Sequence, residues 1–155
     1  MLDALAWWEA AGIPAPEHSQ LAFLSGLSPT ASTFRNTRSV LSTAGFIEYP
    51  DAGRTALTDA GRAIARRPGA APTREELQRR VREKITPAMA RMLDPLIIAY
   101  PGVLTNAELA AAAGVSESAS TFRNIRSSLS SLGAVTYPGS GQTRAADWLF
   151  PAIAA

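Results

Sequence analysis

The chain has 155 residues, of which 46% are hydrophobic and 18% are charged, and it contains no cysteine. This composition is typical of a globular protein with one domain or two small ones, and it excludes disulfides, thiolate metal sites and cysteine nucleophiles. No apolar run approaches the ~20 residues that a membrane-spanning helix needs, so we expect a cytoplasmic protein without membrane association.

The net charge is +2 and the isoelectric point is near 9.5, but the charges are unevenly placed. Residues 1–61 hold three basic and six acidic side chains, residues 62–91 hold nine and three, and residues 92–155 hold three and four. The basic character therefore lies in the middle, between two nearly neutral segments. Such a pattern is weaker evidence for a nucleic-acid partner than the isoelectric point alone.

The chain contains an internal repeat, described below, and its first copy lies in the N-terminal part of the chain. This part contains several segments of regular structure, separated by glycine and proline. The predicted elements are helices over 2–9, 17–25 and 29–44, strands over 46–49 and 54–57, and a further helix after Thr58. Ser28 is the expected N-cap of the third helix, and Gly45 lies just past its end. Three helices followed by a hairpin are typical of a winged helix-turn-helix.

A connecting segment follows, in which Thr73 is the expected N-cap of a helix over 74–85. In the second copy, Thr86 caps a helix that begins at Pro87, and we expect a kink or a restart at Pro95 because proline lacks a backbone donor. The remaining predicted elements are helices over 108–113 and 117–132, the latter capped by Ser116, a strand over 134–137 and a turn over 138–141. No fourth helix of comparable length is expected before a short apolar tail.

The repeat itself is the strongest feature of the sequence. Residues 32–39, STFRNTRS, return 88 positions later as residues 120–127, STFRNIRS, and 19 of the 35 positions from 21 to 55 are identical to their partners. We predict two copies with the same fold, whose helices and hairpins match when 21–55 is superposed on 109–143. The predicted domains are a first unit over 1–66, a linker and connecting helix over 67–85, and a second unit over 86–155.

The motif around Phe34 and Phe122, continued by Leu-Ser-x-x-Gly and in the first copy by Leu-Thr-Asp-Ala-Gly at 57–61, resembles the winged helix-turn-helix superfamily of bacterial regulators. The doubled arrangement also resembles tandem winged-helix segments at the C-terminal ends of some bacterial and phage ATP-binding proteins. That second resemblance implies a fragment or a stand-alone relative, since no Gly-rich phosphate-binding loop is present. The implied fold is mainly α with small β-hairpins (α+β): two tandem winged helix-turn-helix units joined by a basic helical linker.

In such a fold the third helix of each unit enters the major groove of DNA. A helical wheel with Phe34 on the core side places Val40 and Ala44 on one flank and leaves a polar face without carboxylates. Arginine can bind guanine there and asparagine can bind adenine. The predicted DNA-binding residues on these helices are Ser32, Arg35, Asn36, Ser39, Ser120, Arg123, Asn124 and Ser127. The alternative is that small serine and threonine residues only keep this face soluble, and that duplication explains the identities between the two helices.

Other basic residues have a structural as well as a functional interpretation. Arg54 and Arg144 are candidates for modest phosphate binding by the wings. The connecting helix carries Arg79, Arg80 and Arg82. One interpretation is that this helix is a phosphate-contacting brace or a dimer helix, and the other is that the arginines form the solvated side of an ordinary connector. Arg38 and Arg126 are expected to pack their stems along the core and to pair their heads with a carboxylate or with helix-end carbonyls, with a phosphate clamp as the alternative. Tyr49 and Tyr137 are expected to cap the core or to mark a shared contact surface.

Catalysis has little support in the sequence. The only histidine, His18, is expected to be a capping or surface residue, and no metal-ligand or nucleophile pattern is present. We therefore expect no enzyme activity, no metal and no cofactor. The leading hypothesis is a bacterial or phage DNA-binding module, such as a small transcriptional or plasmid regulator, that uses two equivalent helices on duplex DNA. The alternative is an adaptor that docks a protein partner, or itself as a homodimer, through Trp7, Trp8 and Trp148.

Overall fold

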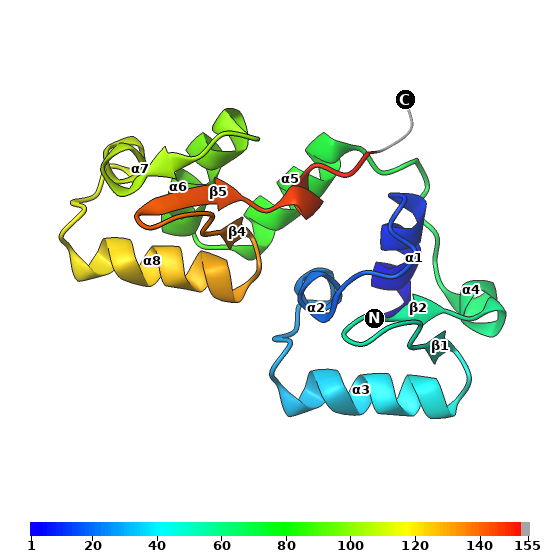
Figure 1. The fold of residues 1–155 in the computed structure, drawn as a ribbon. Coiled ribbons are helices and arrows are strands. Elements are labelled where there is room, and N and C mark those ends of the chain that lie inside the picture. Colours follow the sequence, from blue (N-terminus) through cyan, green and yellow to red (C-terminus); the bar gives the residue numbers. More distant parts are fainter. Residues whose placement is uncertain (153–155) are drawn as a thin grey trace. The chain divides into compact units, whose positions relative to one another are not determined.

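A computed structural model describes residues 1–152 and shows a mainly helical chain with small antiparallel sheets, an α+β architecture (Figure 1). The chain divides into two compact units, residues 1–81 together with 151–152, and residues 82–150. The division falls inside α5 (Arg74–Lys84), the expected connecting helix, whose first turn Thr73 caps as predicted. The apolar tail beyond residue 152 lies outside the described residues. Within 1–152, every helix is too short or too polar to span a bilayer.

Unit 1 consists of a helical layer and one small hairpin. Its elements are α1 (Leu2–Ala10), α2 (His18–Ser25), α3 (Ser32–Thr43), β1 (Ile47–Glu48), β2 (Ala56–Leu57) and α4 (Asp59–Ile64). The strands pair antiparallel, with Ile47 opposite Leu57. Helix α1 packs against α2, α4 and β2, and α3 packs against β1. The predicted order of three helices, a hairpin and a further helix is confirmed.

Unit 2 repeats this plan with a third strand and a shortened end. Its elements are α6 (Pro87–Ala99), β3 (Leu104–Thr105), α7 (Asn106–Ala113), α8 (Ser120–Ser131), β4 (Val135–Thr136), β5 (Gln142–Ala145) and the 3-10 turn η1 (Asp147–Leu149). The strand order is β3-β5-β4, all antiparallel. A single 3-10 turn stands where unit 1 has α4, which agrees with the expectation that no fourth helix of comparable length follows.

The duplication extends to the backbone. The bounds of α2, α3 and β1 return 88 residues later as those of α7, α8 and β4. The hairpin register shifts by the same amount, because the pair Ile47 and Leu57 becomes Val135 and Ala145. The prediction that both copies fold alike is therefore confirmed.

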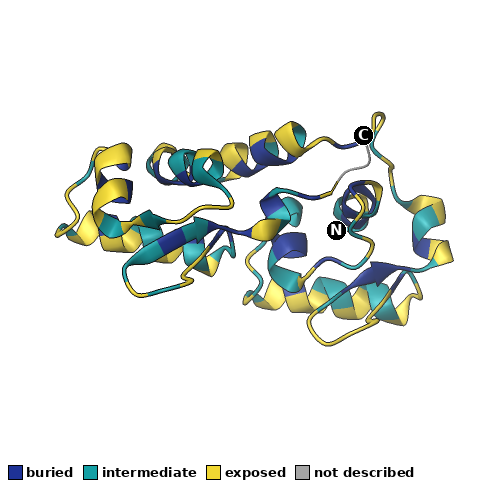
Figure 2. Cartoon of the chain, turned by 45° about the horizontal axis from the view of Figure 1, so that its top comes forward, coloured by how far each residue is buried: buried dark blue, intermediate teal, exposed yellow. Residues whose placement is uncertain are grey.

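Both units contain a buried core (Figure 2), and all but one of the core positions of unit 1 are also buried in unit 2. The buried core residues of unit 1 are Leu5, Ala6, Leu21, Ala22, Phe34, Ile47 and Leu57. At the matching positions, unit 2 buries Leu93, Leu109, Ala110, Phe122, Val135 and Ala145. Burial of these apolar side chains is the main stabilising contribution, and it orients α3 and α8 by their phenylalanines.

Matching caps define the second helix of each unit. At α2 the Glu17 amide donates to the Gln20 side chain (2.7 Å), and at α7 the Thr105 amide donates to the Glu108 carboxylate (2.8 Å). The second of these capping boxes starts α7 two residues before the predicted start. Both helices end at a glycine in the left-handed conformation, Gly26 after α2 and Gly114 after α7. The sequence predicts the first of these ends.

The predicted N-caps Ser28 and Ser116 are wrong. The Ser28 carbonyl accepts from the Ala31 amide (3.1 Å), which closes a turn before α3, and Ala31 takes the N-cap position. The same turn precedes α8. In each copy the helix could begin after the first serine or at the serine four residues later, because both are small polar residues that suit a helix start. The hydrogen bond that closes the turn selects the later start. The Val40 side chain, placed by the wheel on the flank of the core, is 67% exposed.

The helix does not restart at Pro95, as the sequence suggested it could. Helix α6 runs through this residue as one helix. The residues Met92, Leu93 and Leu96 around it are fully buried, and α6 packs against α7, α8 and β5. This packing offsets the backbone hydrogen bond that proline cannot donate.

The close approach of α4 to the hairpin gives a stability prediction. A Cβ at Gly61 would clash with the carbonyl oxygen of Phe46. We expect Gly61→Ala to lower the free energy of unfolding by about 1–3 kcal/mol, measured by urea denaturation. Gly69→Ala is the matched control, because a Cβ at Gly69 would meet no atom within 4 Å, and its change should stay within about 0.5 kcal/mol. A stabilised Gly61→Ala chain, as helix propensity alone requires, would contradict the close contact.

Candidate nucleic-acid interface

The outer face of α3 carries the predicted polar residues. Ser32, Arg35, Asn36 and Ser39 are all exposed or partly exposed, and α3 contains no acidic residue. Phe34 is the one buried side chain of this helix, so its burial turns the opposite face outward. The Arg35 side chain has no hydrogen-bond or salt-bridge partner among residues 1–152, which leaves its guanidinium available to a ligand.

The outer face of α8 presents the same side chains in the same order. Ser120, Arg123, Asn124 and Ser127 are exposed, and α8 also lacks acidic residues. Arg123 makes only a long hydrogen bond to the Ser118 carbonyl (3.5 Å). The structure therefore places all eight helix residues singled out in the sequence on two equivalent, carboxylate-free surfaces.

Arg38 points the other way, from α3 toward the hairpin. Its guanidinium lies 4.8 Å from the centre of the Phe34 ring and 5.6 Å from that of Tyr49. It donates a hydrogen bond to the imidazole Nε2 of His18. The expectation of a stem packed along the core is confirmed, but the partner is an imidazole rather than a carboxylate or a helix-end carbonyl.

Arg126 occupies the matching position of unit 2. Its Nε donates to Thr143 Oγ1 (2.8 Å), a second guanidinium nitrogen donates to the Gln142 carbonyl (3.2 Å), and the Tyr137 ring lies 4.0 Å away. Tyr137 donates its hydroxyl to the Arg126 carbonyl (3.0 Å). The tyrosines thus cover the arginines at the edge of each core, with both rings about half exposed, and arginine is the side chain they cap.

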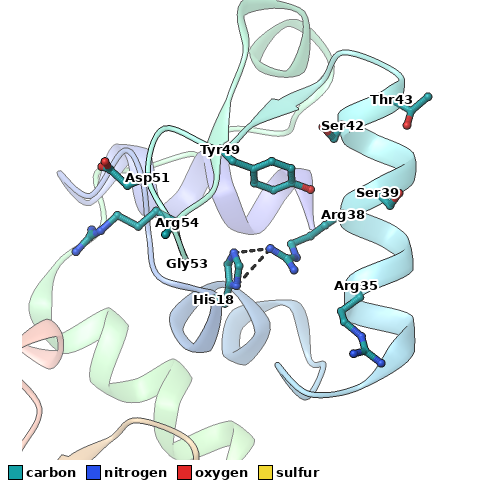
Figure 3. A pocket seen from close by; sticks show the side chains of 11 residues that line it. His18, Arg35, Arg38, Ser39, Ser42, Thr43, Tyr49, Asp51, Gly53 and Arg54 are labelled. Atoms are coloured by element: carbon teal, nitrogen blue, oxygen red, sulfur yellow. Dashed lines mark hydrogen bonds between the residues drawn. The ribbon is translucent and has the colours of Figure 1, made fainter.

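A groove of about 510 Å³ lies between α3, the start of α2 and the hairpin of unit 1 (Figure 3). Its lining includes His18, Arg35, Arg38, Asp51 and Arg54, so arginines outnumber carboxylates. Figure 3 shows Arg38 directed at His18 and Arg54 extending away from both. The groove joins the polar face of α3 to the hairpin.

Burial and the neighbouring Arg38 charge lower the pKa of His18 below its ordinary value of 6.5. A guanidinium can only donate hydrogen bonds, so the ring nitrogen facing Arg38 must be unprotonated. His18 is therefore a neutral acceptor near pH 7. The expectation of a capping or surface residue missed this contact, because the partner lies twenty positions away in the sequence.

The hairpin arginines are already engaged. Arg54 donates to the Ala15 carbonyl (3.0 Å) and to the Glu17 carboxylate (3.3 Å). Arg144 lies 3.5 Å from the Asp147 carboxylate. Both would have to exchange or share a carboxylate before they could hold a phosphate.

The arginines of α5 are paired as well. Arg79 and Arg80 both bind the Glu76 carboxylate at 2.8 Å, and these hydrogen bonds lower the Glu76 pKa to about 2. Arg82 binds the Asp94 carboxylate at 2.7 Å. These exposed pairs contribute little to stability, but they neutralise much of the positive charge of this segment.

The tryptophans do not form an exposed apolar surface. Trp7 and Trp8 are buried, with Trp8 donating to the Gln20 carbonyl (3.3 Å). Trp148 is half-buried and donates to the Gly133 carbonyl (2.6 Å). The contact surface that favoured an adaptor or a homodimer is therefore occupied within each unit.

Within residues 1–152, no three histidine, aspartate or glutamate side chains lie close enough together to hold a metal ion. Searches against protein-family models, curated proteins and solved structures found no match to this chain. The geometry of α3, α8 and the groove of unit 1 is therefore the basis for a functional assignment.

The His18 environment gives a pH prediction. Because the native pKa is lowered, the unfolded chain binds the proton more tightly, so the free energy of unfolding falls as the pH drops below 6.5. We expect His18→Asn, which installs the residue that unit 2 carries at this position, to remove this part of the pH dependence. Urea denaturation of both chains between about pH 5.5 and 7.5 measures the difference. Parallel stability profiles for the two chains would contradict a neutral His18 in the native state.

Proposed function

We propose that this protein is a non-enzymatic, cytoplasmic DNA-binding regulator in which two tandem winged helix-turn-helix units use α3 and α8 as recognition helices. The observation that carries the proposal is the repetition of an exposed, carboxylate-free face with the same serine, arginine and asparagine residues on the same framework. Duplication alone would first repeat these residues, but exposed positions of the same helix have since changed, as Val40 and Ser128 show, whereas the serines, arginine and asparagine of this face are retained.

The chemistry of these side chains suits base edges in the major groove. Arg35 and Arg123 can donate two hydrogen bonds to guanine, and Asn36 and Asn124 can donate to and accept from adenine. The exposed serines between them are small enough to let the helix approach the bases. Each recognition helix has a buried phenylalanine behind it, so a duplex would meet a rigid surface.

The remaining basic residues have a secondary role in this proposal. Arg79, Arg80 and Arg82 are paired with Glu76 or Asp94, and phosphates would have to displace those carboxylates. Phosphate contacts of this kind give affinity without sequence preference. The recognition helices therefore supply both the specificity and the unpaired charge of the interface.

The test is a titration of labelled duplexes at about 50 mM salt, where electrostatic binding is strong. We expect the chain with Arg35→Ala and Arg123→Ala to lose about 1–3 kcal/mol of binding free energy for each base contact, or about one unit of salt slope for each phosphate contact. The substituted positions are exposed, so the free energy of unfolding should change little.

The matched control carries Lys84→Ala and Arg91→Ala, which remove two exposed charges outside α3 and α8. Its affinity should fall less than that of the helix variant, and equally for all duplex sequences. Equal losses in the two chains would refute recognition by α3 and α8. If the unaltered chain has no affinity for any duplex at this salt concentration, the DNA-binding proposal fails and a protein-docking role replaces it.

A further inference from the structure

One cluster of side chains occurs in both units but is bonded differently in each. In unit 1, Arg38 donates to His18, while its own Nε and the hydroxyl of Thr55 are buried without a partner. His18 is the one hydrogen-bond acceptor of the Arg38 guanidinium among residues 1–152. A guanidinium with five donors thus lacks acceptors at the wall of the groove.

In unit 2 the matching arginine is satisfied internally. Arg126 binds the Thr143 hydroxyl and the Gln142 carbonyl of the hairpin, the contacts that Arg38 does not make to its own hairpin. Asn106 stands in the place of His18, and its Oδ1 is buried without a partner. The exchange of histidine for asparagine therefore accompanies a change in where the arginine head is bound.

The charged residues around this arginine also differ between the two units. Arg54 of the first groove is replaced by Gln142, and Asp51 is replaced by Gly139. Arg54 is held by Glu17, and the other charged side chains that line the groove beside Arg38 are Arg35 from α3 and Asp51 from the hairpin. The groove of unit 1 thus combines two arginines with incomplete hydrogen bonding and a space of about 510 Å³.

We propose that the groove of unit 1 is a phosphate subsite, in which Arg35 and Arg38 bind the phosphate oxygens and His18 positions Arg38, and that unit 2 lacks this subsite. Phosphate supplies several acceptors at once, and arginine binds it through paired donors. The inference deepens the proposed function and rests on it only for the source of the phosphate, which is either the duplex backbone or a free phosphate-bearing molecule.

The experiment titrates the full-length chain with inorganic phosphate and follows backbone amide signals by NMR, against sodium chloride at matched ionic strength. Ser39 and Gly53 line the groove, and Ser127 and Gly141 are the matched positions in unit 2. We expect saturating shifts at Ser39 and Gly53, and no such shifts at Ser127 and Gly141. The pKa of His18, the single histidine, should rise when phosphate binds, since an anion favours the imidazolium.

Variants assign the binding to named residues. We expect Arg38→Gln to weaken phosphate binding about tenfold, while Arg126→Gln, its counterpart in unit 2, leaves it unchanged. His18→Asn should weaken binding, because the amide oxygen of the matching Asn106 bonds to no partner in unit 2. His18→Gln should restore part of the binding, because its side chain is one methylene longer and can bring an acceptor to Arg38. If Arg38→Gln does not fold, Asp51→Asn replaces it, because removal of this exposed carboxylate should tighten phosphate binding.

Several results would overturn the proposal: no shift beyond the chloride control, equal shifts in both units, unchanged binding by Arg38→Gln, or an Asp51→Asn chain that binds no tighter. A duplex titration separates the sources. Phosphate binding without duplex binding assigns the site to a free phosphate-bearing molecule and refutes only the proposed function. Duplex binding without a phosphate effect leaves the proposed function intact and refutes the subsite.

Discussion

The burial of one phenylalanine in the third helix of each unit determines what that helix presents to solvent. Phe34 and Phe122 are almost completely buried, and the hydroxyl, guanidinium and amide groups on either side of them are exposed. A helix anchored by one large ring has little freedom to rotate, because rotation would expose the ring and leave a cavity. Arg35 and Asn36, which follow Phe34 directly, are directed outward by this anchor.

Around that anchor the two cores reach the same architecture with different side chains. Trp8 and Leu96 occupy matching positions and are both fully buried. Leu57 and Ala145 form a second matching pair, and their exposed fractions are close to zero. Unit 2 also adds the β3 strand to its sheet, which unit 1 lacks. The backbone and the exposed motif of α3 and α8 are therefore better preserved between the copies than the packing of the cores.

Local signals predicted the order of elements and most of their ends. Thr73 and Thr86 cap the helices that the sequence assigned to them, and Thr58 caps the helix that was expected to follow it. The failures arose where tertiary packing or a competing local bond decided the outcome, as at Pro95 and Ser28. The polar face of α3 was predictable from the helical period, whereas the partners of Arg38 were not, since His18 and Tyr49 approach from other elements.

Within a duplicated protein, identity and divergence carry different information. Phe34, Arg35 and Asn36 are unchanged in the second copy, so the same framework and the same outer face serve both units. The changes from His18 to Asn106 and from Arg54 to Gln142 occur at one groove, where they alter the hydrogen bonding of an arginine that itself does not change. These two changes surround a retained guanidinium, and they distinguish two units whose outer helix faces carry the same serine, arginine and asparagine residues.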